Sequence, residues 1–201
     1  MTRIARVGLL WTSLAMLPAA GEAQFTCTTN ADNTITITGY EGSGGDVTIP
    51  STTNGLRVVS IGDVAFYECE SLTSVTIPNS VTSIGVCTFR FTGLASAKIP
   101  NSVARIGGYA YASCTSLTNV TIGSGVTNIG VLAFSGCTNL TGVYFKGNAP
   151  SLAEYVFLED DSATIYYLLG TTGWGTNFGG RPTAPWNPQA KGSAAPGVRS
   201  D

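Results

Sequence analysis

Apolar and polar positions along the chain recur with a period of 22 or 23 residues. The stretch Ile61–Ile84 returns with small changes at Ile84–Ile106 and Ile106–Ile129, and in part from Ile129 onward. A period of this length predicts a solenoid, in which each coil is one short unit that buries its apolar face only against its neighbours. No window keeps a 3.6-residue periodicity over three turns, so long helices are not expected.

Each repeat is predicted to contain a strand, a shorter extended piece and a turn. In the first unit, Leu72–Ile77 alternates with period two and ends at Pro78, which cannot donate a backbone hydrogen bond to a sheet. Val81–Ile84 is the shorter piece, and Asp63–Cys69 is predicted to be a turn, or a single turn of α- or 3₁₀-helix. Further strands are expected at Ile35–Gly39, Asp46–Pro50 and Ala163–Tyr167, with a turn or short helix at Ser151–Leu158.

The apolar columns of the repeat predict the core. One aromatic ring per coil comes from Phe66, Phe89, Tyr111 and Phe134, and stacked coils place such rings about 5 Å apart. Aliphatic columns accompany them, and the first of these is Leu72, Leu94, Leu117 and Leu140. The second unit is one residue shorter between Phe89 and Leu94, which predicts a local bulge.

Three of the five cysteines, Cys69, Cys114 and Cys137, occupy one repeat column. Cys69 and Cys114 are two coils, or about 10 Å, apart, which is too far for a disulfide. Cys114 and Cys137 lie on adjacent coils and are within reach of a bridge. We expect reduced, buried thiols that pack as small apolar groups, with a Cys114–Cys137 bridge as the alternative.

The N-terminus has the pattern of a secretory signal peptide. Arg3 and Arg6 precede the apolar run Val7–Leu17, and small residues lead to a cleavage position after Ala23. The run is too short to span a bilayer, which takes about 20 residues. We therefore expect a secreted or cell-surface protein without a membrane span. The expected segments are a signal peptide (1–23), an N-terminal cap (24–46), the repeats (47–152), a C-terminal cap (153–187) and a disordered tail (188–201).

Three aromatic residues of the expected C-terminal cap, Trp174, Phe178 and Trp186, are predicted to plug the open end of the core.

Composition excludes several functions. The chain has no histidine, so His-based catalysis and His metal sites are absent. The acidic group Glu154 with Glu159–Asp161 lacks the spacing of a calcium loop and is interpreted as a solvated turn. Lysine and arginine are scattered singly, and charged residues make up only 11% of the chain, which argues against nucleic acid or anionic membrane as a partner. We expect no enzyme activity, no metal and no cofactor.

The repeat, read as IPNSVTSIGxxAFxxCxxLTSVTIP, resembles the BspA-like (treponemal-type) leucine-rich repeat of bacterial surface and secreted proteins. The resemblance covers roughly residues 47–152, and GTTGWGTNFGGRP resembles the ending common in that family. It implies a right-handed, mainly β leucine-rich-repeat solenoid with capped ends and a sheet on its concave face. Members of the family are associated with adhesion to host or matrix proteins and with other protein contacts, and no catalytic motif accompanies them.

Alternation along the strands predicts a binding face. If Val75 and Ile77 point inward, then Ser74 and Thr76 point outward. The candidate partner-binding residues in these columns are Thr48, Ser74, Thr76, Ser96, Lys98, Asn119, Thr121 and Tyr144. Tyr144 is the residue to test first, because tyrosine is enriched in binding hot spots.

The sequence thus predicts an exported, monomeric protein that binds a host, matrix or surface protein through its concave face. The alternative is an extracellular scaffold whose repeats serve only stability. Carbohydrate binding has weaker support, because Tyr40, Tyr144 and Trp174 are scattered along the chain.

Overall fold

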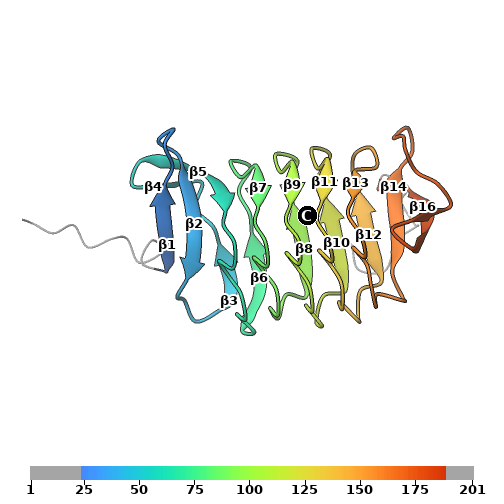
Figure 1. Cartoon of the computed structure of the whole chain (residues 1–201), viewed down its shortest axis with the longest axis horizontal. Helices are drawn as coiled ribbons and strands as arrows, with labels where there is room; N and C mark the ends of the chain where they lie inside the picture. The colour runs from blue at the N-terminus through green and yellow to red at the C-terminus, as the bar shows by residue number, and fades with distance from the viewer. Residues whose placement is uncertain (1–23, 189–201) are drawn as a thin grey trace, which may run out of the picture.

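The computed structural model describes residues 24–188, and the predicted signal peptide and residues 189–201 lie outside this part. Within it the chain forms strands and turns and no helix. The repeats stack as parallel coils along one axis, from the blue N-terminal end to the red C-terminal end in Figure 1. Each coil has three sides, namely a longer strand, a shorter strand and a turn segment. The turn segments contain neither the α- nor the 3₁₀-helical turn that the sequence left open.

The longer strands line one side, which we call the long-strand sheet. It consists of β3 (Gly45–Thr48), β6 (Leu72–Thr76), β8 (Ser96–Ile99), β10 (Asn119–Ile122), β12 (Gly142–Phe145), β14 (Thr164–Leu168) and β16 (Arg181–Trp186), with β15 (Asn177–Phe178) antiparallel to β16. This is the side on which the repeat pattern predicts the concave face.

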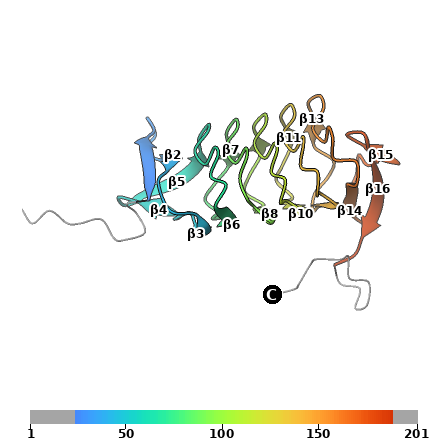
Figure 2. The same ribbon diagram turned by 90° about the horizontal axis from the view of Figure 1, so that it is seen from below.

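The shorter strands form a second side, the short-strand sheet, which Figure 2 shows as a separate row of strands. Its order is β1 (Phe25–Thr29), β2 (Ile35–Tyr40), β5 (Leu56–Ile61), β7 (Ser83–Ile84), β9 (Arg105–Ile106), β11 (Asn128–Ile129) and β13 (Ser151–Leu152), and β4 (Thr52–Thr53) pairs with β5.

The predicted core columns are confirmed. In-phase pairing of β8, β10 and β12 aligns Ala97, Val120 and Val143. The rings of Phe66, Phe89 and Tyr111 are fully buried and stack with centroids 5.0 and 5.1 Å apart. The column continues through Phe134, as predicted, and ends at Phe157. The sequence pattern did not assign Phe157 to the column.

The short second unit interrupts the long-strand sheet, which is divided between β6 and β8. The pairing of β8 with β10 shows no register shift, so the ladder is interrupted only on the β6 side of β8. The local bulge between Phe89 and Leu94 stays a prediction. Thr92 fills the cysteine column, because its N–H donates to the Phe89 carbonyl as the cysteine N–H groups donate to their own aromatic residues. Gly93 then spans the shortened turn, where an added Cβ would lie 2.2 Å from the Glu70 carbonyl oxygen.

The turn segments form a third ladder, which no sequence pattern indicated. Backbone N–H groups donate to the next coil, for example from Phe66 to Thr88 at 2.8 Å and from Phe89 to Ala110 at 2.7 Å. The residues two before and two after each ring adopt positive φ, as at Val64 (53°) and Glu68 (58°). This conformation is uncommon outside glycine. We infer that the cross-coil hydrogen bonds compensate for it.

The bend glycines are explained by close packing. Gly85, Gly107 and Gly130 do not have positive φ. A Cβ at Gly107 would lie 2.4 Å from the backbone of Gly85 on the preceding coil, so any side chain there would push the coils apart.

Aromatic side chains cover both ends of the core. At the N-terminal end the Tyr40 ring stacks on Phe66 at 5.1 Å. At the C-terminal end Trp174 and Phe178 pack against Phe145 at 4.9 and 5.7 Å, as predicted. Trp186 does not join them. Its ring lies instead against Tyr144 on the outward face of the long-strand sheet.

The cysteine column supplies buried thiols. The five cysteines all lie within residues 24–188, and no disulfide joins any two of them. The Cys114 thiol donates to the Phe89 carbonyl at 3.0 Å and the Cys137 thiol to the Tyr111 carbonyl at 3.1 Å. Cys69, at the start of the column, is only half-buried, so its predicted full burial is wrong.

Candidate functional site

The outward face of the long-strand sheet carries the residues that alternation predicted. Strand pairing places Ser96 beside Asn119 and Lys98 beside Thr121. Five of the predicted side chains are exposed and two are half-buried. We call these seven the outward row: Thr48, Ser74, Thr76, Ser96 and Lys98, which are exposed, and Asn119 and Thr121, which are half-buried.

Most of the outward row makes no hydrogen bond within the fold. Within residues 24–188, six of its seven side chains form no hydrogen bond: Thr48, Ser74, Thr76, Ser96, Lys98 and Thr121. Other threonines behave differently. The hydroxyls of four of them donate to a carbonyl of the preceding coil at 3.0–3.2 Å: Thr82, Thr118, Thr127 and Thr141. The outward row therefore keeps hydroxyl and ammonium groups available to another molecule.

Tyr144 occupies the outward column but is only 3% exposed, so its predicted exposure is wrong. A Cβ at Gly142 would lie 2.7 Å from the Tyr144 ring, which lies flat across this position of its own strand. Tyr166 stacks on the ring at 4.8 Å, and Trp186 contacts it edge-on at 5.2 Å. Burial raises the pKa of its hydroxyl. Tyr144 is packing for the C-terminal end of this face and cannot serve as an open contact residue.

A recess of about 380 Å³ lies beside the outward row. It combines Lys98 and Thr76 from the row with Asn79 and Asn101 from the turns that follow β6 and β8, and with Lys146 just after β12. Sequence reasoning missed Lys146, although its position two residues after Tyr144 gives it the same strand parity. The recess therefore brings together two lysines that lie two coils apart in the repeat.

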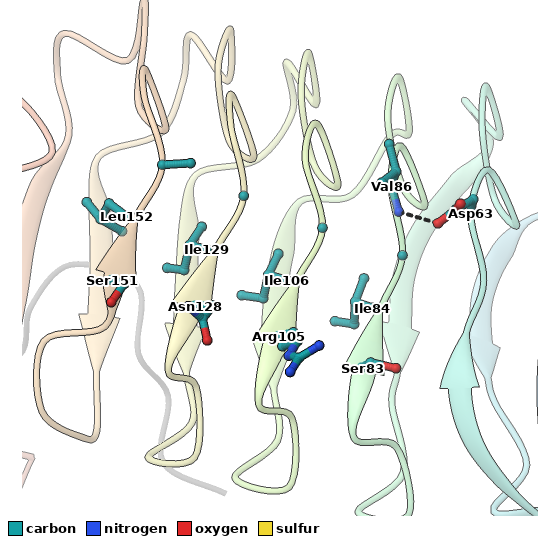
Figure 3. A pocket seen from close by; sticks show the side chains of 14 residues that line it. Asp63, Ser83, Ile84, Val86, Arg105, Ile106, Asn128, Ile129, Ser151 and Leu152 are labelled. Atoms are coloured by element: carbon teal, nitrogen blue, oxygen red, sulfur yellow. Dashed lines mark hydrogen bonds between the residues drawn. The ribbon is translucent and has the colours of Figure 1, made fainter.

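A second, shallow groove of about 550 Å³ runs along the short-strand sheet. Figure 3 shows Ile84, Ile106 and Ile129 repeated along its length, with the Asp63 carboxylate accepting a hydrogen bond from the Val86 N–H at 2.7 Å. The N–H groups of its bend glycines are already bonded to the preceding coil, as from Gly107 to the Ile84 carbonyl at 2.9 Å. The groove is lined mainly by apolar residues, with Ser83, Arg105, Asn128 and Ser151 as its further polar side chains.

The acidic turn near the C-terminal end is not uniformly solvated. Glu159 and Asp161 are exposed, but Asp160 is 0% exposed, so the prediction of a solvated turn is wrong for this residue. Asp160 lies three residues after Phe157 and therefore continues the cysteine column. Both of its carboxylate oxygens are buried without a hydrogen-bond partner, and burial raises its pKa to about 7.

Neighbouring Asp161 instead accepts a hydrogen bond from Arg181 at 2.7 Å. Across residues 24–188, no three His, Cys, Asp or Glu side chains are grouped so that they would hold a metal ion.

The repeat geometry agrees with a comparison of the sequence with known families. The model of the BspA type leucine rich repeat region matches residues 45–164 in six copies. The chain belongs to this family. The resemblance inferred from the repeat is thereby confirmed, together with the leucine-rich-repeat solenoid that it implied. A comparison with curated proteins finds no match.

Solved structures of bacterial leucine-rich-repeat proteins are similar to this BspA-type chain. A leucine rich repeat protein of T. pallidum is 27% identical, with a TM-score of 0.49 over 73% of this chain and 84% of its own. A leucine rich cell surface protein of Faecalibacterium prausnitzii is 28% identical, with a TM-score of 0.50 over 72% of this chain and 53% of its own. The chain thus spans about half the length of that protein. In residues 24–188 we find no helix that would cross a membrane.

Proposed function

We propose that this BspA-type protein is exported and binds a host, matrix or surface protein through the outward row. The observation that carries the proposal is the exposed set of hydroxyl and ammonium groups without partners inside the fold, because groups of this kind form the hydrogen bonds of a protein interface. The small side chains at Ser74, Thr76 and Ser96 make the surface flat, which suits a broad contact. The cell-surface description of the F. prausnitzii relative supports an exported role.

Binding to purified matrix proteins tests the proposal. The full chain would be immobilised and probed with collagen, fibronectin, laminin and fibrinogen in turn by surface plasmon resonance. Introducing two tyrosines into the exposed row (Ser74→Tyr with Ser96→Tyr) places bulky rings on the flat surface. We expect this to weaken binding by about tenfold or more, which corresponds to at least ~1.4 kcal/mol.

The matched control places the same rings on the short-strand sheet. Asn128 and Ser151 are exposed and paired across β11 and β13, so Asn128→Tyr with Ser151→Tyr adds equal bulk elsewhere. Binding by this variant should stay within about twofold of the unmodified chain. Equal losses in both variants would contradict the assignment of the surface. Absence of binding to all four proteins would favour the alternative of a scaffold without a specific ligand.

A further inference from the structure

We propose that the recess beside the outward row binds an acidic peptide segment, through the ammonium groups of Lys98 and Lys146. This inference rests on the proposed function and adds the chemical class of the partner at that surface.

The two lysines are charges without an internal partner. Lys98 is exposed, Lys146 is half-buried, and both line the recess. Within residues 24–188 an ion pair forms only between Arg181 and Asp161, at the C-terminal end. No carboxylate lines the recess. Ligand carboxylates therefore meet two ammonium groups that form no ion pair with an acidic side chain of residues 24–188.

The neutral groups of the recess also favour an anion. The Asn101 side-chain carbonyl accepts a hydrogen bond from the Ser124 N–H at 3.0 Å. Its amide N–H groups are therefore the part of the side chain that has no partner within the fold. Thr76 adds a hydroxyl that makes no hydrogen bond within residues 24–188, and hydroxyls donate readily to carboxylates. The lining thus presents several donors around one small volume.

Charge is distributed unevenly over the coils, and this distribution favours the binding of an acidic partner at the long-strand sheet. Most exposed acids near the coils lie on the turn segments, where they would repel an acidic partner: Asp63, Glu68, Glu70, Glu154, Glu159 and Asp161. Within residues 24–188, Asp46 on β3 is the one acid in the strands of the long-strand sheet, and it lies beside Ser74, two coils before Lys98. Both lysines of residues 24–188 lie instead at the long-strand sheet. An acidic segment is therefore guided to this face and away from the turns.

A peptide fits the surface better than a sugar chain does. Sugar recognition uses the open faces of aromatic rings, but Tyr144 and Tyr166 stack on one another and Trp186 packs against Tyr144. The exposed surface beside the recess consists instead of small side chains at Ser74, Thr76 and Ser96, over which an extended chain can lie.

Titration with a synthetic octaglutamate peptide, followed by fluorescence anisotropy of a label on the peptide, tests the inference. We expect binding that weakens as salt is raised. Lys98→Ala or Lys146→Ala should each reduce affinity about threefold, and Lys98→Glu with Lys146→Glu by about tenfold or more. The control is Arg57→Glu with Arg105→Glu, which changes net charge equally at exposed positions of the short-strand sheet. It should leave affinity within about twofold.

Equal weakening by the two charge-reversed variants would overturn the site, because net charge alone would then explain it. Binding of a heparin fragment through both lysines, without binding of octaglutamate, would overturn the assignment to a peptide. The proposed function is separable from this result. If the tyrosine variant of the row blocks a matrix protein while Lys98→Glu with Lys146→Glu leaves that complex unchanged, the acidic-segment inference fails and the binding face stands.

Discussion

Replacement of Phe134 by alanine is expected to lower the free energy of unfolding by about 3–5 kcal/mol, the usual loss for a buried phenylalanine. The Phe134 ring is 0% exposed and lies between Tyr111 and Phe157, with centroid distances of 5.2 and 5.7 Å. Truncation therefore opens a cavity in the middle of the column. The coils cannot close over it, because backbone hydrogen bonds hold both neighbours, as from Phe134 to the Val156 carbonyl at 3.0 Å.

Urea denaturation of the purified chain measures this loss. The matched control is Tyr155→Ala, because Tyr155 belongs to the same turn ladder but is 63% exposed. We expect the control to change the free energy of unfolding by less than about 0.5 kcal/mol. A loss below about 1 kcal/mol for Phe134→Ala would contradict the assignment of the ring column as the main core.

Replacement of Asp160 by asparagine is expected to stabilise the chain at pH 8, on the order of 2–4 kcal/mol. Burial raises the pKa of Asp160 to about 7, because the loss of water disfavours the charged form of its carboxylate. The folded chain therefore holds this proton more tightly than the unfolded chain does. The resulting contribution to stability is fully present below about pH 4 and is lost as the pH rises towards 7. Asparagine keeps the shape and removes the buried charge.

Free energies of unfolding measured between pH 4 and pH 8 test this prediction. The difference between Asp160→Asn and the unmodified chain should grow with pH in the direction that favours the variant. Glu70→Gln, at an exposed position on another coil, controls for removal of one carboxylate and should reproduce the pH profile of the unmodified chain. Parallel pH curves for the unmodified chain and Asp160→Asn would show that Asp160 carries no buried charge.

The repeats made most of the core predictable. In-phase stacking sets each side chain on its counterpart in the next coil, so a residue type that recurs in a column reports a shared environment. The leucine column shows this, because Leu72, Leu94, Leu117 and Leu140 are all 0% exposed. The same argument identified the outward positions from Thr48 to Thr121.

Prediction failed where a column changes residue type. Thr92 and Asp160 take places otherwise held by cysteine. The charge of the aspartate side chain alone suggested a solvated position for Asp160. The available signal was Phe157, which continues the aromatic column three residues before Asp160. Chain position within the repeat was therefore more informative than side-chain polarity.

Prediction also failed where a contact comes from outside the repeat. Tyr144 is covered in part by Trp186, from a cap that has no counterpart in the coils. Gly142 offered a partial signal, because it is the one glycine in a column that also contains Asp46, Ser74, Ser96, Asn119 and Thr164. The positive φ of the turn ladder left no sequence signal, because residues as different as Val64 and Tyr109 adopt it.

The most direct test of the outward row as a binding surface is an amine-labelling footprint of the complex. Lys98 and Lys146 both lie at this face, and mass spectrometry quantifies their acetylation separately. The full chain would be labelled alone and when saturated with whichever of the four matrix proteins binds it. We predict that labelling of both lysines falls several-fold in the complex. Unchanged labelling of Lys98 and Lys146 in a saturated complex would show that the partner binds elsewhere.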